Sequence, residues 1–124
     1  MKSQEEVWQE VGRIADSYPL LKCDECAIAI VQYLNSLQIE NTVLRLRTRS
    51  FNELFVTSDR YDKDESITRN GNHYGVEVMG KVFDNLSSDG LSRELWIADF
   101  SCPSGRFILE EVPLSSLLYP ENQS

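Results

Sequence analysis

The chain has 124 residues, 41% of them hydrophobic, which is enough for one compact domain with its own core and excludes extensive disorder. Its formal net charge is −8, from 20 acidic and 12 basic residues, and this argues against nucleic-acid binding because contacts to phosphate need a basic face. No apolar run approaches membrane-spanning length and the N-terminal residues lack the apolar segment of a secretory signal, so we expect no membrane partner.

The three cysteines are an odd number in a chain without a secretory signal, which indicates a reduced, cytoplasmic protein whose thiols are not paired in disulfides. We expect a single domain over residues 1–124, with residues 120–124 frayed. The only histidine is His73, so any mechanism that uses histidine must use this residue.

Two helices are predicted at the start of the chain. Ser3 and Glu6 fit a capping box, and apolar residues follow at helical spacing, which predicts a helix over residues 4–16. A second apolar stripe predicts a helix over residues 22–37. Cys23 heads this stripe and therefore lies on the first turn of the second helix.

The rest of the chain predicts short strands, turns and loops. The predicted strands are residues 42–49, 54–57, 73–78, 81–85 and 106–110. The other predicted segments are loops over 58–71 and 86–91, a strand or short helix over 93–100, and a short helix over 112–118. Alternation in the first strand places its arginines on a face that we expect to be solvated. The predicted fold class is α+β, with N-terminal helices packed on a small antiparallel sheet.

The predicted hairpin over residues 73–85 brings two polar residues together. If Met79 and Gly80 form its turn, His73 and Asp84 are diagonal neighbours on one face, with backbones about 7–8 Å apart and side chains able to meet. A carboxylate at this place accepts the imidazole N–H and fixes its tautomer. Gly75 lies between them and leaves room for the contact.

Cys23 completes a set of groups with a known chemical logic. The start of a helix carries free N–H groups and partial positive charge, which favour the reactive thiolate. A thiol, a histidine and a carboxylate that orients the histidine are the parts of a cysteine enzyme, namely nucleophile, general base and orienting group. Their order along the chain, Cys23, His73 and Asp84, is that of papain-like and transglutaminase-like enzymes.

The sequence combines Lys-Cys-x-x-Cys-Ala at 22–27, the segments 72–76 and 82–85, Gly90 and Trp96. Together these motifs resemble the bacterial papain-fold toxin type 2 domains of this papain-like and transglutaminase-like superfamily. The resemblance spans roughly residues 11–100. It implies a cysteine hydrolase or acyltransferase without a cofactor that acts on protein amide groups, as a peptidase or as a deamidase of glutamine side chains.

The resemblance also implies roles for individual residues. Cys23 would be the catalytic nucleophile, His73 the base and Asp84 the orienting residue. Cys26 is the alternative nucleophile, because papain has a Cys-x-x-Cys in which the second cysteine is catalytic. The backbone N–H of Cys23 is one candidate oxyanion donor, and the side chains of Asn72 and Asn85 are candidates for another.

Domains of this kind are often delivered at the end of large secreted polypeptides and are neutralised by an immunity protein. The expected partners are therefore a protein substrate and an immunity or inhibitor protein. Delivery into a target cell as part of a larger secreted protein is the alternative to a cytoplasmic location.

Three other functions remain open from the residues alone. A redox Cys-x-x-Cys at a helix start uses Cys23 and Cys26. A zinc site would use these two cysteines with His73 and Cys102, although the second pair is not clustered as in structural zinc sites, and we expect no metal. A papain-like binding domain without catalytic activity would have the same helices and hairpin.

Overall fold

The computed structural model describes residues 2–50, 52–62 and 64–118. The predicted fraying of residues 120–124 lies outside the described residues. The α+β class is confirmed, because N-terminal helices pack on an antiparallel sheet. Among the residues that the structure describes, no helix combines the length and the apolar character needed to cross a membrane.

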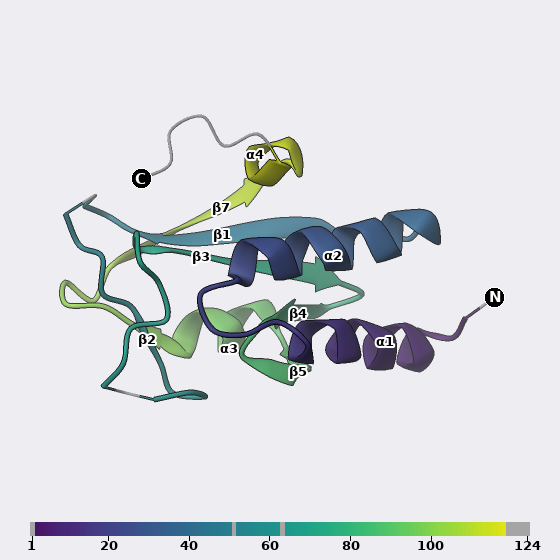
Figure 1. Ribbon diagram of the computed structural model, residues 1–124, viewed down its shortest axis with the longest axis horizontal. Coiled ribbons are helices and arrows are strands. Elements are labelled where there is room, and N and C mark those ends of the chain that lie inside the picture. The colour runs from purple at the N-terminus through teal and green to yellow at the C-terminus, as the bar shows by residue number, and fades with distance from the viewer. Residues whose placement is uncertain (1, 51, 63, 119–124) are drawn as a thin grey trace.

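Two antiparallel helices open the fold and lie on one face of the sheet (Figure 1). Helix α1 (Gln4–Asp16) has the predicted bounds, and its predicted capping box is confirmed. Helix α2 (Cys23–Ser36) begins at the first cysteine and ends one residue before the predicted end.

The main sheet has five strands in the order β5-β4-β3-β1-β7, and all of its neighbours are antiparallel. These strands are β1 (Thr42–Thr48), β3 (Asn72–Val78), β4 (Lys81–Asp84), β5 (Ser87–Leu91) and β7 (Phe107–Val112). A separate two-stranded ribbon joins β2 (Thr57–Ser58) to β6 (Phe100–Ser101). The remaining helices are α3 (Arg93–Ala98) and α4 (Ser115–Leu118).

Two sequence predictions about segments are wrong. Only Thr57 of the predicted strand 54–57 is in a strand, because the segment before it is held by hydrogen bonds to Ser66 and Thr68 rather than by a neighbouring strand. The predicted loop 86–91 contains β5, whose polar sequence lacks alternation. It forms a strand because it pairs with β4 through a bulge and because α1 packs against it.

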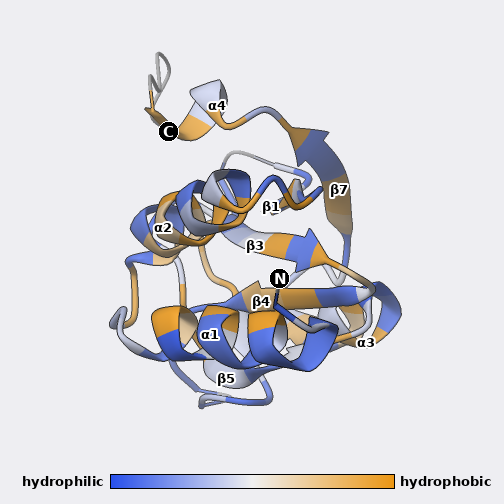
Figure 2. Ribbon diagram, turned by 90° about the vertical axis from the view of Figure 1, so that its right-hand side faces the viewer, coloured by the Kyte–Doolittle hydropathy of each residue, from blue (hydrophilic) through white to orange (hydrophobic). Residues whose placement is uncertain are grey.

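The sheet separates two apolar cores. The core on the α1 and α2 side includes residues from both helices and from β1, β3 and β4: Val7, Val11, Cys26, Ala27, Ile30, Leu34, Val43, Val76, Val78 and Phe83 among others. Figure 2 shows the apolar side of α1 turned toward α2 and β4. The core on the other face is built around α3 and includes Leu44, Leu46, Val56, Ile67, Val82, Trp96 and Phe100.

The predicted hairpin register is confirmed by the pairs Val78↔Lys81 and Val76↔Phe83. Pairing between β3 and β4 stops at Val76, so the first four residues of β3 (72–75) have no paired residue on β4. Gly75 faces Trp96, and a Cβ at this glycine would lie 2.8 Å from the indole ring. The nearest groups that the glycine leaves room for are thus the Trp96 indole and the Val82 side chain.

The arginine face of β1 differs from the prediction. Arg45 and Arg47 are half-buried, and both donate to the same carboxylate oxygen of Glu110, at 2.9 and 3.0 Å. Glu110 lies opposite Arg45 on β7. These side chains are ion-paired across two strands because the β1 and β7 register places them together, which the β1 sequence alone does not reveal.

Candidate active site

His73 and Asp84 meet in the protein interior, as the hairpin predicts. The Nε2 of His73 lies 2.9 Å from Asp84 Oδ2, and both side chains are almost completely buried. The rings of Trp96 and Phe100 cover the imidazole, with centroids 6.0 and 5.0 Å away. The His73 ring is thus held by one carboxylate and two aromatic neighbours.

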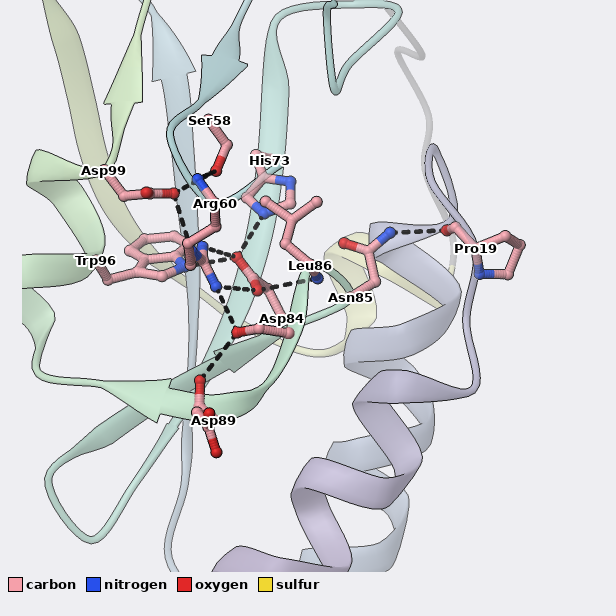
Figure 3. Close-up of polar contacts among 11 residues, drawn as sticks. Pro19, Ser58, Arg60, His73, Asp84, Asn85, Leu86, Asp89, Trp96 and Asp99 are labelled. Atoms are coloured by element: carbon pink, nitrogen blue, oxygen red, sulfur yellow. Dashed lines mark hydrogen bonds and ion pairs between the residues drawn. The ribbon is translucent and has the colours of Figure 1, made fainter. Parts of the chain in front are cut away.

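Asp84 is the centre of a larger set of hydrogen bonds (Figure 3). Arg60 donates to both carboxylate oxygens, at 2.9 and 2.8 Å, and the Trp96 indole N–H donates to Oδ2 at 2.8 Å. The backbone N–H of Leu86 donates to Oδ1 at 3.2 Å. Every one of these donors favours the ionised carboxylate.

These contacts lower the pKa of Asp84 and raise the pKa of His73. Burial alone would raise the pKa of Asp84, but hydrogen bonds from His73 and Arg60 outweigh it and hold the pKa of this carboxyl well below its usual range. Burial alone would lower the pKa of His73, but the Asp84 hydrogen bond and then contact with Cys23 outweigh it and raise the pKa to about 9. The site therefore favours an imidazolium beside a carboxylate at neutral pH.

The second ring nitrogen of His73 is available. Nδ1 is buried and has no hydrogen-bond partner in the described structure. Cys23 contributes to the raised pKa of His73, so its sulfur lies close to the ring even though the two groups form no hydrogen bond of normal geometry. Since Nε2 is occupied by Asp84, Nδ1 is the nitrogen left for the thiol.

Cys23 comes to the ring through the connector between α1 and α2. The side-chain amide of Asn85, just after β4, donates to the Pro19 carbonyl at 2.8 Å. Leu20 packs against the core on the far face of the sheet. The connector is thus tied to the residue that follows β4, and α2 starts after it with a buried Cys23, 9% exposed.

Cys26 has a different environment one turn later. It is 1% exposed and belongs to the core between the helices and the sheet. Burial first, and then the charges of Asp84 and Cys23, raise the pKa of Cys26 to about 12. This thiol stays protonated at neutral pH and behaves as a small core residue.

The sulfur of Cys102 makes its polar contacts with neighbouring residues of its own turn. It lies in the turn before β7, where its sulfur contacts the Arg106 carbonyl at 3.4 Å and the Ser104 hydroxyl at 3.7 Å. In residues 2–50, 52–62 and 64–118, no three His, Cys, Asp or Glu side chains gather in a way that could hold a metal ion. The four residues of the zinc alternative therefore do not form the ligand set it requires.

The two candidate oxyanion residues are placed differently. Asn72 is the first residue of β3 and lies opposite Arg47 on β1. Asn85 holds Pro19 through its amide nitrogen, while its side-chain oxygen is buried without a partner. Asn85 therefore has an evident structural task in fixing the connector.

Sequence analysis missed the groups behind Asp84. Arg60 and Ser58 lie in the segment predicted as a loop, and Asp99 follows α3, yet all three join one polar network. Nothing near Arg60 in the sequence identifies its partner.

A family model described as papain fold toxin 2 matches residues 6–101, which is well over half of the chain. No curated protein and no solved structure matches the chain. The matched region runs from the first turn of α1 to the end of β6 and contains Cys23, His73 and Asp84. The chain belongs to the papain fold toxin 2 family.

Proposed function

We propose that this protein is a cysteine hydrolase that acts on amide groups of proteins. Cys23 is the nucleophile, His73 the general base and acid, and Asp84 the group that orients His73. The membership in a papain-fold toxin family supports a cysteine-dependent toxin or effector domain. The roles of the three residues and the reaction are argued from the geometry of the site.

One observation carries it. His73 is a buried imidazole whose Nε2 is held by a carboxylate and whose Nδ1 is left without a partner, near a cysteine on the first turn of a helix. A buried ring nitrogen without a partner costs free energy in a structural role. A general base needs such a nitrogen, oriented toward the group that it deprotonates.

The first chemical step forms a thioester. The proton of Cys23 already resides on His73 Nδ1, so the sulfur attacks the amide carbonyl carbon as a thiolate, and the C=O electron pair moves to oxygen. The oxyanion then collapses, the C–N bond breaks, and His73 returns the proton to the leaving nitrogen. The product that leaves is ammonia or an amine, and the acyl group stays on sulfur.

The second step releases the acyl group. Neutral His73 takes a proton from water as the oxygen attacks the thioester carbonyl, the C–S bond breaks, and the sulfur leaves as the thiolate beside the imidazolium. The products are a carboxylic acid and free Cys23. In both steps the oxyanion needs N–H donors, and the backbone N–H of Cys23 supplies one at the start of α2. Asn85 already uses its amide nitrogen on Pro19, which favours Asn72 as the second donor.

Cys23 is favoured over Cys26 because it is the more accessible of the two thiols and because burial raises the pKa of Cys26. Cys26 is a core residue with a pKa of about 12, whereas Cys23 lies at the helix start beside the imidazole. The expected partners are a protein substrate and an immunity or inhibitor protein. The setting that fits the family is delivery into a target cell, with cytoplasmic action there.

The test is the rate of iodoacetamide labelling of each cysteine between pH 5 and pH 10, read by peptide mass spectrometry. Cys102 is a matched control within the chain, because it is partly exposed and its sulfur contacts Ser104 and Arg106 in a surface turn. At pH 7 we expect Cys23 to react about tenfold faster than Cys102 or more, and Cys26 to stay unmodified in the folded protein. If Cys23 is no faster than Cys102, the proposal is wrong.

A companion assay follows the reaction itself. A mixture of casein peptides is incubated with the wild-type protein and with Cys23→Ala, and mass spectrometry scores new peptide termini and the conversion of glutamine to glutamate. Products that require Cys23 distinguish a peptidase from a deamidase. Turnover that survives in Cys23→Ala but is lost in Cys26→Ala would assign the nucleophile to Cys26.

A further inference from the structure

Arg60 approaches the site from the far side of Asp84. Its two terminal nitrogens bind the two oxygens of the Asp84 carboxylate, at 2.9 and 2.8 Å, and its Nε binds Asp99 Oδ2 at 2.9 Å. The Arg60 side chain is 17% exposed, while those of Asp84 and Asp99 are 0% and 8% exposed. Such a two-pronged contact fixes the plane of a carboxylate as well as its charge.

The plane of the Asp84 carboxylate determines where His73 can bind. Oδ2 accepts from His73, from Trp96 and from one prong of Arg60, and Oδ1 accepts from the other prong and from the Leu86 backbone. If the guanidinium were absent, Oδ1 would keep a single weak donor at 3.2 Å. The carboxylate would then be freer to rotate, and the His73 ring with it.

Arg60 also affects the protonation of the His73 imidazole, because its charge lies close to the ring. Asp84 and Asp99 are two carboxylates held by one guanidinium, so the three side chains carry one net negative charge, which an imidazolium neutralises. Without Arg60, a single imidazolium would face two nearby carboxylates. The groups that face or surround the ring are Asp84 from β4, Cys23 from α2, the rings of Trp96 and Phe100, and, behind Asp84, Arg60 and Asp99.

We propose that Arg60 is a positioning residue for the reaction. Its guanidinium holds the Asp84 carboxylate in the orientation that binds His73, and its charge offsets the second carboxylate, Asp99. Arg60 does not touch the reacting sulfur and acts through Asp84. This inference rests on the proposed function, because it names what keeps the general base in place.

The alternative is that Arg60 only anchors the segment that carries it. That segment has its own contacts: the Ser58 hydroxyl donates to Asp99, and the Asp59 N–H donates to the Asp99 carbonyl at 3.0 Å. An anchoring role predicts that removal of Arg60 lowers stability without changing His73. The two roles therefore differ in what happens to the imidazole.

The experiment exploits the single histidine of the chain. Nitrogen-15 labelling of histidine allows the titration, the tautomer and the Nε2–H proton of His73 to be followed by NMR in the full-length protein. The variants are Arg60→Gln, which removes the charge and the two-pronged contact, and Arg60→Lys, which keeps the charge alone. Asp99→Asn is the matched control, because it removes an Arg60 partner but leaves the Asp84 contact in place.

The expected shifts have opposite signs. In Arg60→Gln the titration midpoint of His73 should rise by about one pH unit, because an opposing cation is lost, and in Asp99→Asn it should fall. In Arg60→Lys the midpoint should stay near the wild-type value. In both Arg60 variants the Nε2–H proton should exchange with water at least several times faster, and Cys23 labelling at pH 7 should slow by a similar factor.

An unchanged His73 midpoint and Nε2–H exchange rate in folded Arg60→Gln would overturn the inference and leave Arg60 as an anchor. If that variant does not fold, the Nε2–H exchange rate in Arg60→Lys decides, since a wild-type rate there overturns the positioning role. Failure of the proposed function looks different. In that case Cys23 is already slow in the wild-type protein, whatever the Arg60 variants do to His73.

Discussion

The two N-terminal helices begin in different ways. Helix α1 begins with a complete capping box, in which the Ser3 hydroxyl accepts from the Glu6 N–H at 3.2 Å and the Glu6 carboxylate accepts from the Ser3 N–H at 2.8 Å. Helix α2 begins after Lys22, which makes no side-chain cap, and after Leu21, whose backbone has a φ of 74°. One helix start is optimised for stability, and the other is not.

The difference shows that the start of α2 is less stable than the start of α1. A missing cap costs about 1 kcal/mol, and a left-handed backbone at a non-glycine residue costs about as much. Both occur immediately before Cys23, at the N-terminus of α2, which lies beside His73. The uncapped N–H groups of α2 remain available for a thiolate or an oxyanion, a task that α1 does not have.

The largest expected effect comes from His73, the β3 residue that lies beside the start of α2. Its pKa is raised from 6.5 to about 9 in the folded protein, so its contribution to stability is fully present below pH 6.5 and is lost as the pH rises through about 9. We expect the free energy of unfolding to fall by up to about 3 kcal/mol over this interval. Urea denaturation at closely spaced pH values measures it.

His73→Gln is the control for this prediction. It should remove the decline between pH 6.5 and pH 9 while leaving the loss of stability in acid, where Asp84 and the other carboxylates take up protons. Parallel stability curves for the wild-type protein and the variant across the alkaline interval would show that His73 is not held as an imidazolium.

A smaller effect is expected at the α1 start. Ser3→Ala removes the hydroxyl that accepts the Glu6 N–H, and we expect it to lower the free energy of unfolding by about 1 kcal/mol. Cys23 labelling by iodoacetamide should be unchanged, because α1 starts far from the thiol in the chain and contributes no group to the site. A changed labelling rate would mean that the two helix starts are coupled.

The smallest effect is expected when alanine replaces the N-cap residue of α2, Lys22. Lys22→Ala should change the free energy of unfolding by less than about 0.5 kcal/mol, because Lys22 makes no cap and its pair with Glu25, at 3.4 Å, is exposed. Urea denaturation beside Ser3→Ala makes the comparison direct. A loss as large as that of Ser3→Ala would show that Lys22 does stabilise the helix start.

Some of this molecule follows from the sequence by itself. The bounds of α1, the start of α2 at Cys23 and the His73–Asp84 contact depend on residues within about a dozen positions of one another, where periodicity, capping and hairpin register apply. These patterns and the family resemblance together predict Cys23, His73 and Asp84 as a set. Their chemical roles stay a prediction that labelling and turnover will test.

Only the tertiary structure decided the rest. Arg60 is 24 residues from Asp84 and 39 from Asp99, and the pairing of β5 depends on β4 and α1, so no local pattern reveals these contacts. The difference between Cys23 and Cys26, three positions apart, likewise comes from packing, which buries one thiol in the core and places the other beside an imidazole. Local patterns define elements and register, but burial and long-range pairing set the proton affinities on which the chemistry depends.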